Sequence, residues 1–353
     1  MQEKRNHRGL SFVTTAFVPG HFQGHAMSTA RKALVLGATG GAGGEIAAAL
    51  LRRGWQVRGL VRDASRPGLS APIEWHAGDA MNAADVAQAA HGVKVIVHAV
   101  NPPGYRNWQK LSLPMLEHTL AAARATGARI MLPGNVYNYG PDALPLLHED
   151  SPQHPLTRKG AIRVAMEQRL QQAAAEGVRT LILRCGDFFG PRASSNWFAA
   201  MVKPGRPVRA VNYPGEPGLR HAWAYLPDVG ETAAALLERE HELAAFECFH
   251  FGGHWVDGQA MAAAIRRATG HAKLPLRPFP WWLVTLAAPL VALFRELREM
   301  RYLWQLPLQL DNRKLVALLG TEPHTELDQA VEATLRGLGC LNGATAKPTG
   351  SKL

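Results

Sequence analysis

Cysteine is scarce in this chain of 353 residues. The three cysteines, Cys185, Cys248 and Cys340, lie far apart and form no Cys-x-x-Cys pair. This spacing indicates neither a disulfide framework nor a zinc site, whose ligands usually come in closely spaced pairs. Unpaired thiols fit a reducing compartment, so we expect a cytoplasmic protein.

The first 26 residues carry basic side chains but lack the sustained apolar run that a signal peptide needs. A second methionine, Met27, stands just before the first predicted strand. We therefore expect 1–26 to be a disordered or non-native extension, with a transit peptide as the alternative. We also expect a flexible tail at 341–353. Its last three residues spell the peroxisomal address, but the Ala-, Arg- and Gly-rich composition is typical of bacteria, where that address has no reader.

Acidic residues are outnumbered by basic ones, which gives a formal net charge of +11 and an isoelectric point near 9.9. This balance favours anionic partners, such as phosphate groups or an acidic membrane surface. The basic residues are scattered and accompany no stacking aromatics or recognition helix, so we expect no nucleic-acid partner. Nothing in the sequence indicates the oligomeric state.

Long apolar runs are also few, and the longest uncharged one covers the 17 residues 278–294. This run is too short for a clear membrane span, and Pro280 and Pro289 interrupt it. We favour a cap helix over the substrate pocket. The alternatives are a spanning helix and an interfacial helix, in which peripheral membrane contact through 278–304 would place Arg295, Arg298 and Arg301 against lipid headgroups.

Apolar runs of strand length alternate with helical stretches through the first half of the chain. The predicted strands are 33–36, 56–61, 73–77, 93–99, 129–132 and 179–184, with helices including 110–126 and 160–176. This alternation predicts an α/β fold with a doubly wound parallel sheet and helices on both faces. Right-handed crossovers then place the ligand at the carboxyl ends of the strands.

A glycine-rich turn follows the first predicted strand in the segment 33–46, which reads ALVLGATGGAGGEI. In such a turn, one glycine permits the tight bend, one lets the backbone approach a pyrophosphate, and one lets the helix pack close to the strand. A glycine-rich surface loop is the alternative, but a strand precedes this turn and a helix follows it. We predict that a dinucleotide is bound by Gly37, Thr39, Gly40, Gly41, Ala42 and Gly43.

The second strand ends in VRGLVRD, so Arg62 stands about 20 residues past the glycine turn, where an acidic side chain would bind the ribose of NAD. Arginine there favours a 2′-phosphate, and either Arg58 or Arg62 could bind it. We therefore predict NADP, with NAD as the alternative. Asp79 is the expected partner of the adenine amino group. The fourth strand is expected to end against the cofactor at His98, Ala99 and Val100.

These observations predict an NAD(P)-binding Rossmann domain at 27–190. Beyond it the pattern loosens, with a strand at 246–251 and helices at 228–240, 257–269, 311–319 and 325–336. We expect 191–340 to form a smaller mixed substrate cap, interleaved with the last elements of the Rossmann domain.

Six motifs resemble the extended short-chain dehydrogenase/reductase superfamily, also called the NAD-dependent epimerase/dehydratase family. They are GATGGAGGEIA at 37–47, VRGLVRD at 57–63, GD at 78–79, VYNYGP at 136–141, LRCGDFFGP at 183–191 and WAYLPDVGET at 223–232. The resemblance covers about residues 31–240. It implies a nicotinamide cofactor, redox chemistry at a carbonyl or alcohol of a small-molecule substrate, a catalytic serine or threonine, and a Tyr-x-x-x-Lys pair after the fifth strand.

The chain departs from the family at this pair. The family often carries an acid four residues after its lysine; with Glu167 as that acid, the lysine position is Arg163 and the tyrosine position is Lys159. The serine position falls on Pro133 or Gly134. Arg163 could hold the ribose hydroxyls but stays protonated, so it cannot relay a proton. Lys159 could act as an acid if burial or a neighbouring cation lowered its pKa.

Other candidate donors follow the fifth strand. Tyr137 is the nearest to the expected substrate face by register, Tyr139 is a second candidate, and Asn135 could orient a substrate carbonyl; packing within the loop is the alternative for the tyrosines. The predicted catalytic residues are Tyr137, Lys159, Arg163 and Asn135, and no metal ligand is predicted.

Residues of the later motifs have less specific expectations. Asp187 faces the pocket if the family register holds, whereas Cys185 is expected to be a small buried hydrophobic residue. His221 and Asp228 are expected to fix the cap to the Rossmann core.

Three functions remain open from the sequence. The first is an NADP(H)-dependent oxidoreductase of the short-chain dehydrogenase type that works without the usual Tyr-x-x-x-Lys pair. The second is a non-catalytic NADP(H)-binding regulator or scaffold, and the third is a membrane-associated partner in an assembly. Turnover of the cofactor separates the first from the second.

Overall fold

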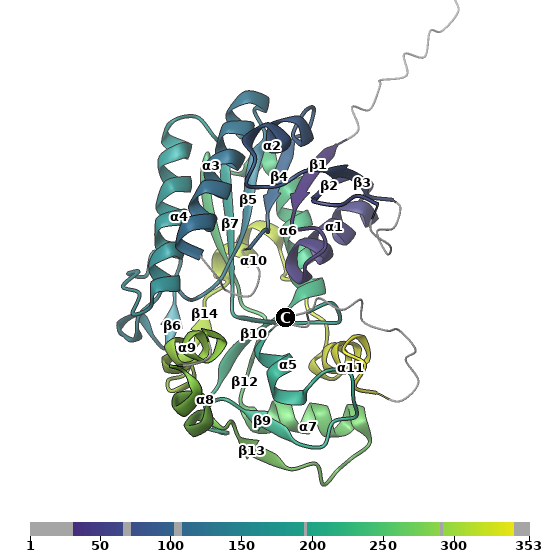
Figure 1. Cartoon of the computed structure of the whole chain (residues 1–353), viewed down its shortest axis with the longest axis vertical. Helices are drawn as coiled ribbons and strands as arrows, with labels where there is room; N and C mark the ends of the chain where they lie inside the picture. Colours follow the sequence, from purple (N-terminus) through teal and green to yellow (C-terminus); the bar gives the residue numbers. More distant parts are fainter. Residues whose placement is uncertain (1–30, 66–71, 102–107, 194–195, 290–291, 342–353) are drawn as a thin grey trace, which may run out of the picture. The chain divides into compact units, whose positions relative to one another are not determined.

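The computed structural model describes residues 31–65, 72–101, 108–193, 196–289 and 292–341. Its main sheet has seven strands, all parallel, in the order β11-β7-β5-β4-β1-β2-β3 (Figure 1). These strands are β1 (Lys32–Leu36), β2 (Gln56–Val61), β3 (Glu74–Ala77), β4 (Val95–His98), β5 (Arg129–Gly134), β7 (Thr180–Cys185) and β11 (Phe246–Phe251). The strand order reverses between β1 and β4, which is where a doubly wound sheet binds its ligand.

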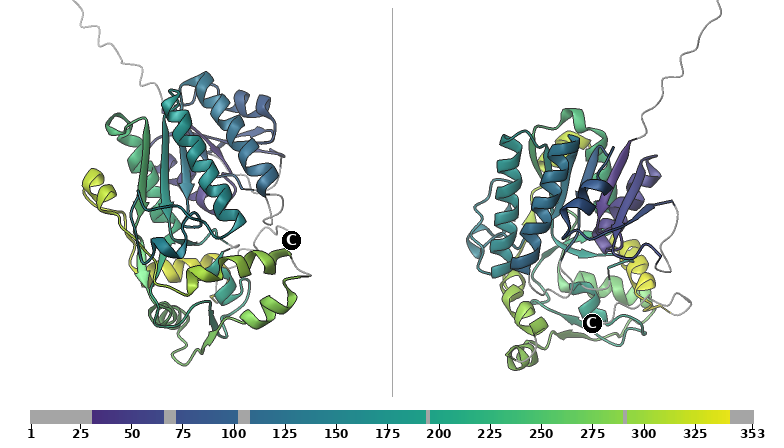
Figure 2. Two further views of the ribbon diagram at one scale, coloured as in Figure 1. Left: turned by 90° about the vertical axis from the view of Figure 1, so that its left-hand side faces the viewer. Right: turned by 45° about the horizontal axis from the view of Figure 1, so that its top comes forward.

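Helices cover both faces of this sheet (Figures 1 and 2). The helices α2 (Ala83–Ala89), α3 (Trp108–Thr126) and α4 (Arg158–Ala175) pack on one face, and α1 (Gly41–Arg52), α6 (Leu226–Glu238) and α10 (Arg313–Leu319) pack on the other. The alternation of side chains along β1 explains the two layers. Ala33 and Val35 belong to the core under α1 and α6, while Leu34 and Leu36 belong to the core under α2, α3 and α4.

A second group of elements packs around its own aromatic core. It comprises three small sheets, β12-β10-β8, β13-β9 and β14-β6, and several helices. The elements are β6 (Leu146–Leu147), β8 (Asp187–Phe189), α5 (Trp197–Val202), β9 (Val211–Tyr213), β10 (His221–Tyr225), β12 (His254–Val256), α7 (Gly258–Thr269), β13 (Leu276–Pro278), β14 (Gln309–Leu310) and α11 (Leu327–Gly337). Trp197, Phe198, Trp223 and Trp304 form the centre of this core. We refer to this group as the cap.

The predicted fold class is confirmed, because the main sheet is parallel and doubly wound. The strand predicted at 246–251 forms β11 at the edge of the main sheet, next to β7. The segment 191–340 therefore supplies β11, α6 and α10 to the Rossmann layer and the remaining elements to the cap.

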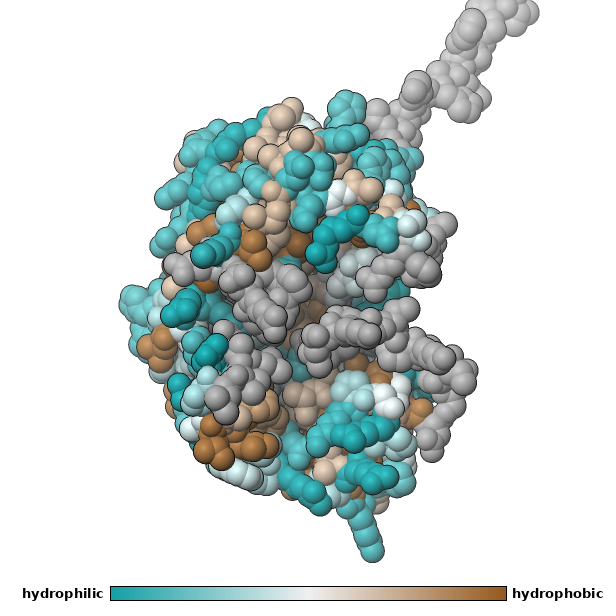
Figure 3. All heavy atoms as spheres, viewed as in Figure 1, coloured by the Kyte–Doolittle hydropathy of each residue, from teal (hydrophilic) through white to brown (hydrophobic). Residues whose placement is uncertain are grey.

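The uncharged segment 278–294 differs from the single cap helix that we favoured. It forms two short helices, α8 (Trp281–Ala287) and α9 (Ala292–Glu299), because Pro289 cannot continue the first one. Apolar side chains gather on the outer surface of α8 (Figure 3). Among the described residues, no helix has the length and apolar content needed to cross a bilayer.

Candidate functional site

The turn between β1 and α1 is shaped by two glycines that cannot be replaced without collision. Gly37 has a φ of +89°, and a Cβ there would lie 2.5 Å from the carbonyl oxygen of Ala99. A Cβ on Gly43 would lie 2.3 Å from the carbonyl oxygen of Gly37. By contrast, a Cβ on Gly40 would meet only that same oxygen, at 3.2 Å. The protein's own packing therefore requires Gly37 and Gly43, whereas Gly40 faces open space.

The amino end of α1 offers backbone donors to a ligand. Its N-cap is Gly40, which has no side chain to accept the first amides, and the nitrogen of Gly44 already donates to the Gly40 carbonyl at 2.9 Å. In an α-helix, the amides that precede the first helical bond have no acceptor within the helix. Here these amides belong to Gly41, Ala42 and Gly43. In α4, the Thr157 hydroxyl fills the corresponding role by accepting from Gly160. The turn, including the exposed Thr39, thus fits a pyrophosphate.

Arg62 lies exposed just past the end of β2, on the carboxyl edge of the sheet. Arg58, the alternative ligand for a 2′-phosphate, does not reach this edge. Its buried guanidinium donates to the carbonyls of Ala89 (2.6 Å) and His91 (3.1 Å) and pairs with Glu74 at 3.0 Å. The Arg58 alternative is therefore wrong, because that side chain joins β2 to β3 and to the end of α2.

Asp79 is exposed beyond the carboxyl end of β3, and its Oδ1 accepts from the nitrogen of Met81 at 2.9 Å. Ala99 is half-buried beyond β4, where its carbonyl oxygen closes against the Gly37 turn. Both residues lie on the edge where the sequence placed them, and their contact with a cofactor stays a prediction.

The first turns of α4 bring two cations to the carboxyl ends of β4 and β5. Lys159 and Arg163 stand one helical turn apart, and each is only 5% exposed. Arg163 donates from Nη2 to Oδ1 of Asn101, just past β4, at 3.0 Å. A Cβ on Gly160 would lie 2.2 Å from the carbonyl oxygen of Tyr137, so the helix packs directly on the loop after β5.

That loop carries the other predicted residues. The Oδ1 of Asn135 accepts from the nitrogen of Tyr137 at 3.1 Å, and the Tyr137 ring packs against the core of the cap. Asn135 and Tyr137 therefore lie beside the start of α4, close in space to Lys159 and Arg163. The structure brings the four predicted catalytic residues into one region and leaves their roles as predictions.

His98, at the end of β4, lies where the sequence predicts that the fourth strand ends against the cofactor. Its Nδ1 lies 2.8 Å from the hydroxyl of Thr119, which donates in turn to the Met115 carbonyl at 3.0 Å. The Nδ1 therefore carries the proton, and Nε2 is an acceptor without a hydrogen-bond partner in the described part of the chain. Burial, together with the positive charge of Arg163, lowers the pKa of His98 to about 3, so the ring is neutral.

Glu167 fixes the helix that carries the two cations. Its buried carboxylate pairs with Arg184 of β7 at 2.7 Å and accepts from Gln153 at 3.0 Å. Arg184 also donates to the hydroxyl of Tyr139, which is fully buried and lies 3.2 Å from Nε2 of His250. Burial raises the pKa of Tyr139 well above its usual range. The alternative role of Tyr139 as a proton donor is therefore wrong, and this residue belongs to the support of α4.

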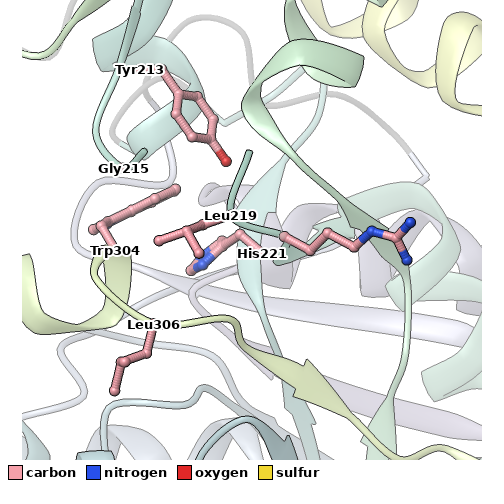
Figure 4. A pocket seen from close by; sticks show the side chains of 7 residues that line it. Tyr213, Gly215, Leu219, His221, Trp304 and Leu306 are labelled. Atoms are coloured by element: carbon pink, nitrogen blue, oxygen red, sulfur yellow. The ribbon is translucent and has the colours of Figure 1, made fainter. Parts of the chain in front are cut away.

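A narrow hollow, too small to hold a water molecule, lies in the cap (Figure 4). Trp304 and Leu306, from the segment after α9, line it together with His221 of β10. The His221 ring stacks on Trp304 at 3.9 Å between centroids, and its Nε2 lies 2.7 Å from Oδ2 of Asp187. Asp187 and His221 thus form a buried pair between β8 and β10.

Two further expectations concern residues near this pair. Asp228 accepts from both the nitrogen and the hydroxyl of Thr325 at 2.7 Å, which ties α6 to the segment before α11. Burial raises the pKa of the Cys185 thiol well above its usual range, in keeping with its expected role as a small hydrophobic residue.

A parallel sheet in this order, with a Gly-x-x-Gly-x-x-Gly turn after β1, defines a dinucleotide-binding protein of the Rossmann type. More narrowly, the chain belongs to the NAD dependent epimerase/dehydratase family, whose model matches residues 33–250. The resemblance noted in the sequence is confirmed, and the family supports a nicotinamide cofactor without distinguishing NADP from NAD.

Two curated proteins are similar to parts of the chain. A 3-diazoavenalumate denitrifying reductase of Streptomyces sp is 30% identical over 175 residues, which are 45% of this chain and 57% of that protein. A putative dihydroflavonol 4-reductase of Synechocystis sp. is 38% identical over 88 residues, which are 24% of this chain and 25% of that protein. The matched regions therefore span only part of these relatives.

Solved structures share the fold over a longer stretch. The UDP-glucuronic acid 4-epimerase of Bacillus cereus, solved with UDP-glucuronic acid and NAD, superposes with a TM-score of 0.68 at 18% identity, over 87% of this chain and 98% of that one. A UDP-galactose 4-epimerase superposes with a TM-score of 0.64 at 20% identity, over the same shares of the two chains. At these identities, the likeness shows the fold alone.

Proposed function

We propose that this chain is an NADP(H)-dependent oxidoreductase that interconverts a carbonyl and an alcohol of a small molecule, with Lys159 in the place of the family's tyrosine. The observation that carries the proposal is the burial of Lys159 and Arg163, one turn apart on α4, at the edge where the glycine turn opens. The two partly matched relatives are both named as reductases, which favours net redox chemistry over epimerisation.

Residues along the carboxyl edge of the sheet would each hold a different part of the cofactor. The glycine turn with the first amides of α1 would hold the pyrophosphate, and the exposed Arg62 would bind the 2′-phosphate. Asp79 would accept from the adenine amino group. Arg163, fixed by its bond to Asn101, would donate to the hydroxyls of the nicotinamide ribose. When bound, the nicotinamide supplies a hydride to the substrate carbon or accepts one from it.

Lys159 would move the proton. It stands at the tyrosine position of the family's pair, one helical turn before Arg163, and is only 5% exposed. In the direction of reduction, a hydride adds to the carbonyl carbon while Lys159 gives a proton from Nζ to the carbonyl oxygen, so that the products are an alcohol and a neutral amine. Arg163 stays protonated throughout and acts by position. Asn135 would orient the carbonyl.

The test measures NADPH binding and NADPH oxidation separately, over a panel of aldehydes and ketones. We expect Lys159→Met to bind NADPH as the wild type does and to lose about 100-fold or more in turnover. Tyr137→Phe should retain most of the turnover, and Lys110→Met, which changes an exposed lysine of α3, should match the wild type.

Two results would overturn the proposal in different ways. Undiminished turnover in Lys159→Met would remove the proton donor and leave hydride transfer standing. Micromolar binding of NADPH by the wild type, with no oxidation by any acceptor, would instead identify a non-catalytic NADP(H)-binding regulator or scaffold.

A further inference from the structure

Helix α8 presents an apolar face to solvent. Trp282 is 72% exposed, Leu286 71% and Leu283 42%, on a helix of seven residues without a single charge. The opposite side of α8 is held to the cap, since Val284 is buried and Nε1 of Trp281 donates to the carbonyl of Pro214 at 2.7 Å. The hydrophobic surface over α8 in Figure 3 therefore belongs to a fixed helix rather than to a loose segment.

Arginines stand at both ends of this apolar face. Arg295 of α9 donates to the carbonyl of Pro289, just past the end of α8, at 3.4 Å. The guanidinium of Arg301 lies 5.4 Å from the centroid of the Trp281 ring, at the start of α8. Arg298 is exposed on the same helix as Arg295. Among the described residues, no ion pair joins these three arginines to a carboxylate, and α9 also carries the exposed Glu299.

We propose that α8 and α9 dock on the surface of an anionic phospholipid bilayer. Trp282, Leu283 and Leu286 enter the headgroup region, and the arginines that bracket them bind lipid phosphates. Tryptophan and leucine beside arginine are the side chains that suit the boundary between water and acyl chains. The net charge of +11 adds attraction between the whole protein and such a surface.

The same face does not suit a second copy of the chain. A two-fold contact through this face would place Arg295, Arg298 and Arg301 of both copies in one interface, and like charges repel. Three exposed apolar side chains also fall far short of the roughly 20–30 residues a side that a stable protein interface uses. Charge complementarity therefore selects the bilayer over a symmetric dimer.

The experiment pellets the full chain with vesicles of phosphatidylcholine alone, or of phosphatidylcholine with phosphatidylglycerol. We expect binding to the anionic vesicles at least about tenfold tighter than to the neutral ones, weakening as salt is added. The double variant Trp282→Ser/Leu286→Ser should lose at least about tenfold in affinity for anionic vesicles. Brominated acyl chains should quench the part of the wild-type tryptophan fluorescence that comes from Trp282. In Trp282→Ser this quenching should be absent.

A charge-matched pair of variants shows whether the location of the arginines matters. Arg295→Gln/Arg298→Gln should bind anionic vesicles several-fold more weakly than the wild type. Lys94→Gln/Arg124→Gln removes two exposed charges at the amino edge of the main sheet, before β4 and at the end of α3, and should lose less than twofold. Equal losses of vesicle affinity in both pairs would show that only the net charge of the protein matters. That result would contradict docking through α8 and α9.

Two other outcomes would also refute the proposal. Wild-type protein that stays in the supernatant at low salt does not dock on lipid. A wild-type dimer in sedimentation velocity that Trp282→Ser/Leu286→Ser converts to a monomer would assign the face to a second copy. Because all the altered side chains are exposed, the unfolding temperature of each variant should match that of the wild type and confirm that it is folded.

Discussion

Substituting alanine at Gly43 tests how closely the turn after β1 is packed. The new methyl would lie 2.3 Å from the carbonyl oxygen of Gly37 and 3.1 Å from Cβ of Ala99. The Gly37 oxygen cannot move away freely, because it also accepts from the nitrogen of Gly40 at 2.9 Å. A relaxed contact between carbon and oxygen is about 3.3 Å, so α1 must shift by about 1 Å. Overpacking of this kind costs about 1–3 kcal/mol of unfolding free energy.

The shift also moves the first amides of α1, so Gly43→Ala should weaken NADPH binding along with stability. Gly40→Ala separates the two effects. Its methyl meets only the Gly37 oxygen at 3.2 Å, so we expect a loss of unfolding free energy below about 1 kcal/mol. The same methyl would stand in the open space over the turn, where a pyrophosphate approaches, and should weaken NADPH binding by at least about tenfold.

Urea unfolding and NADPH titration of each variant provide the two measurements. Gly92→Ala is the control, because Gly92 has a φ of +72° with nothing within 4 Å of a new Cβ. It should cost about 1–2 kcal/mol through backbone strain and leave the NADPH affinity unchanged. If Gly40→Ala bound NADPH as tightly as the wild type, the pyrophosphate would not lie over this turn, and the reasoning would fail.

Three further predictions concern charge. Arg62→Asp should lower the affinity for NADPH relative to NADH by about 10- to 100-fold, because a charge-assisted hydrogen bond contributes about 1.5–3 kcal/mol. If the ratio of the two dissociation constants stayed unchanged, Arg62 would not bind the 2′-phosphate. Glu167→Gln leaves Arg184 buried without its counter-charge and should cost about 3–5 kcal/mol in urea unfolding, whereas a loss below about 1 kcal/mol would contradict the support role of this pair. Burial and the positive charge of Arg184 lower the pKa of His250 to about 3. Below about pH 6.5, the His250 side chain is therefore protonated in the unfolded chain but stays neutral in the folded chain. His250 therefore does not lower the free energy of unfolding above that pH, and it lowers it by about 2 kcal/mol at pH 5. The free energy of unfolding of His250→Leu should fall less than that of the wild type between pH 7.5 and pH 5. An equal fall in both proteins would contradict the lowered pKa of His250.

Local patterns in the sequence were enough to predict the turn between β1 and α1. The glycine spacing at 37–43 and the strands around it determine the turn, because the residues that shape it are neighbours in the chain. Glu167 likewise placed Lys159 and Arg163 on one face of a helix, since residues four apart lie one turn apart.

Contacts between distant segments could not be predicted in the same way. Arg58 and Arg62 both follow the pattern of a strand end, and only the carbonyls of Ala89 and His91 show that the first is buried under the sheet. The pairing of Asp187 with His221 depends on the register between β8 and β10, which no local pattern specifies.

The exposed face of α8 was only partly predicted from the sequence, which favoured a cap helix and left an interfacial helix open as an alternative. An uncharged run predicts burial by composition alone, yet in the structure Pro289 ends the helix and only one side of it packs on the cap. The periodicity of 278–294 is too weak to show which side that is.

The two cations on α4 argue against a site that has merely lost its chemistry. Burying a charged side chain costs free energy unless a partner offsets it, and an unused site would tolerate apolar residues at both positions. Meanwhile, Glu167 and Arg184 still fix the helix that holds Lys159 and Arg163 at the carboxyl edge of the sheet. A ligand rich in hydroxyl and phosphate oxygens would accept hydrogen bonds from Lys159 and Arg163, which apolar side chains at these positions could not donate.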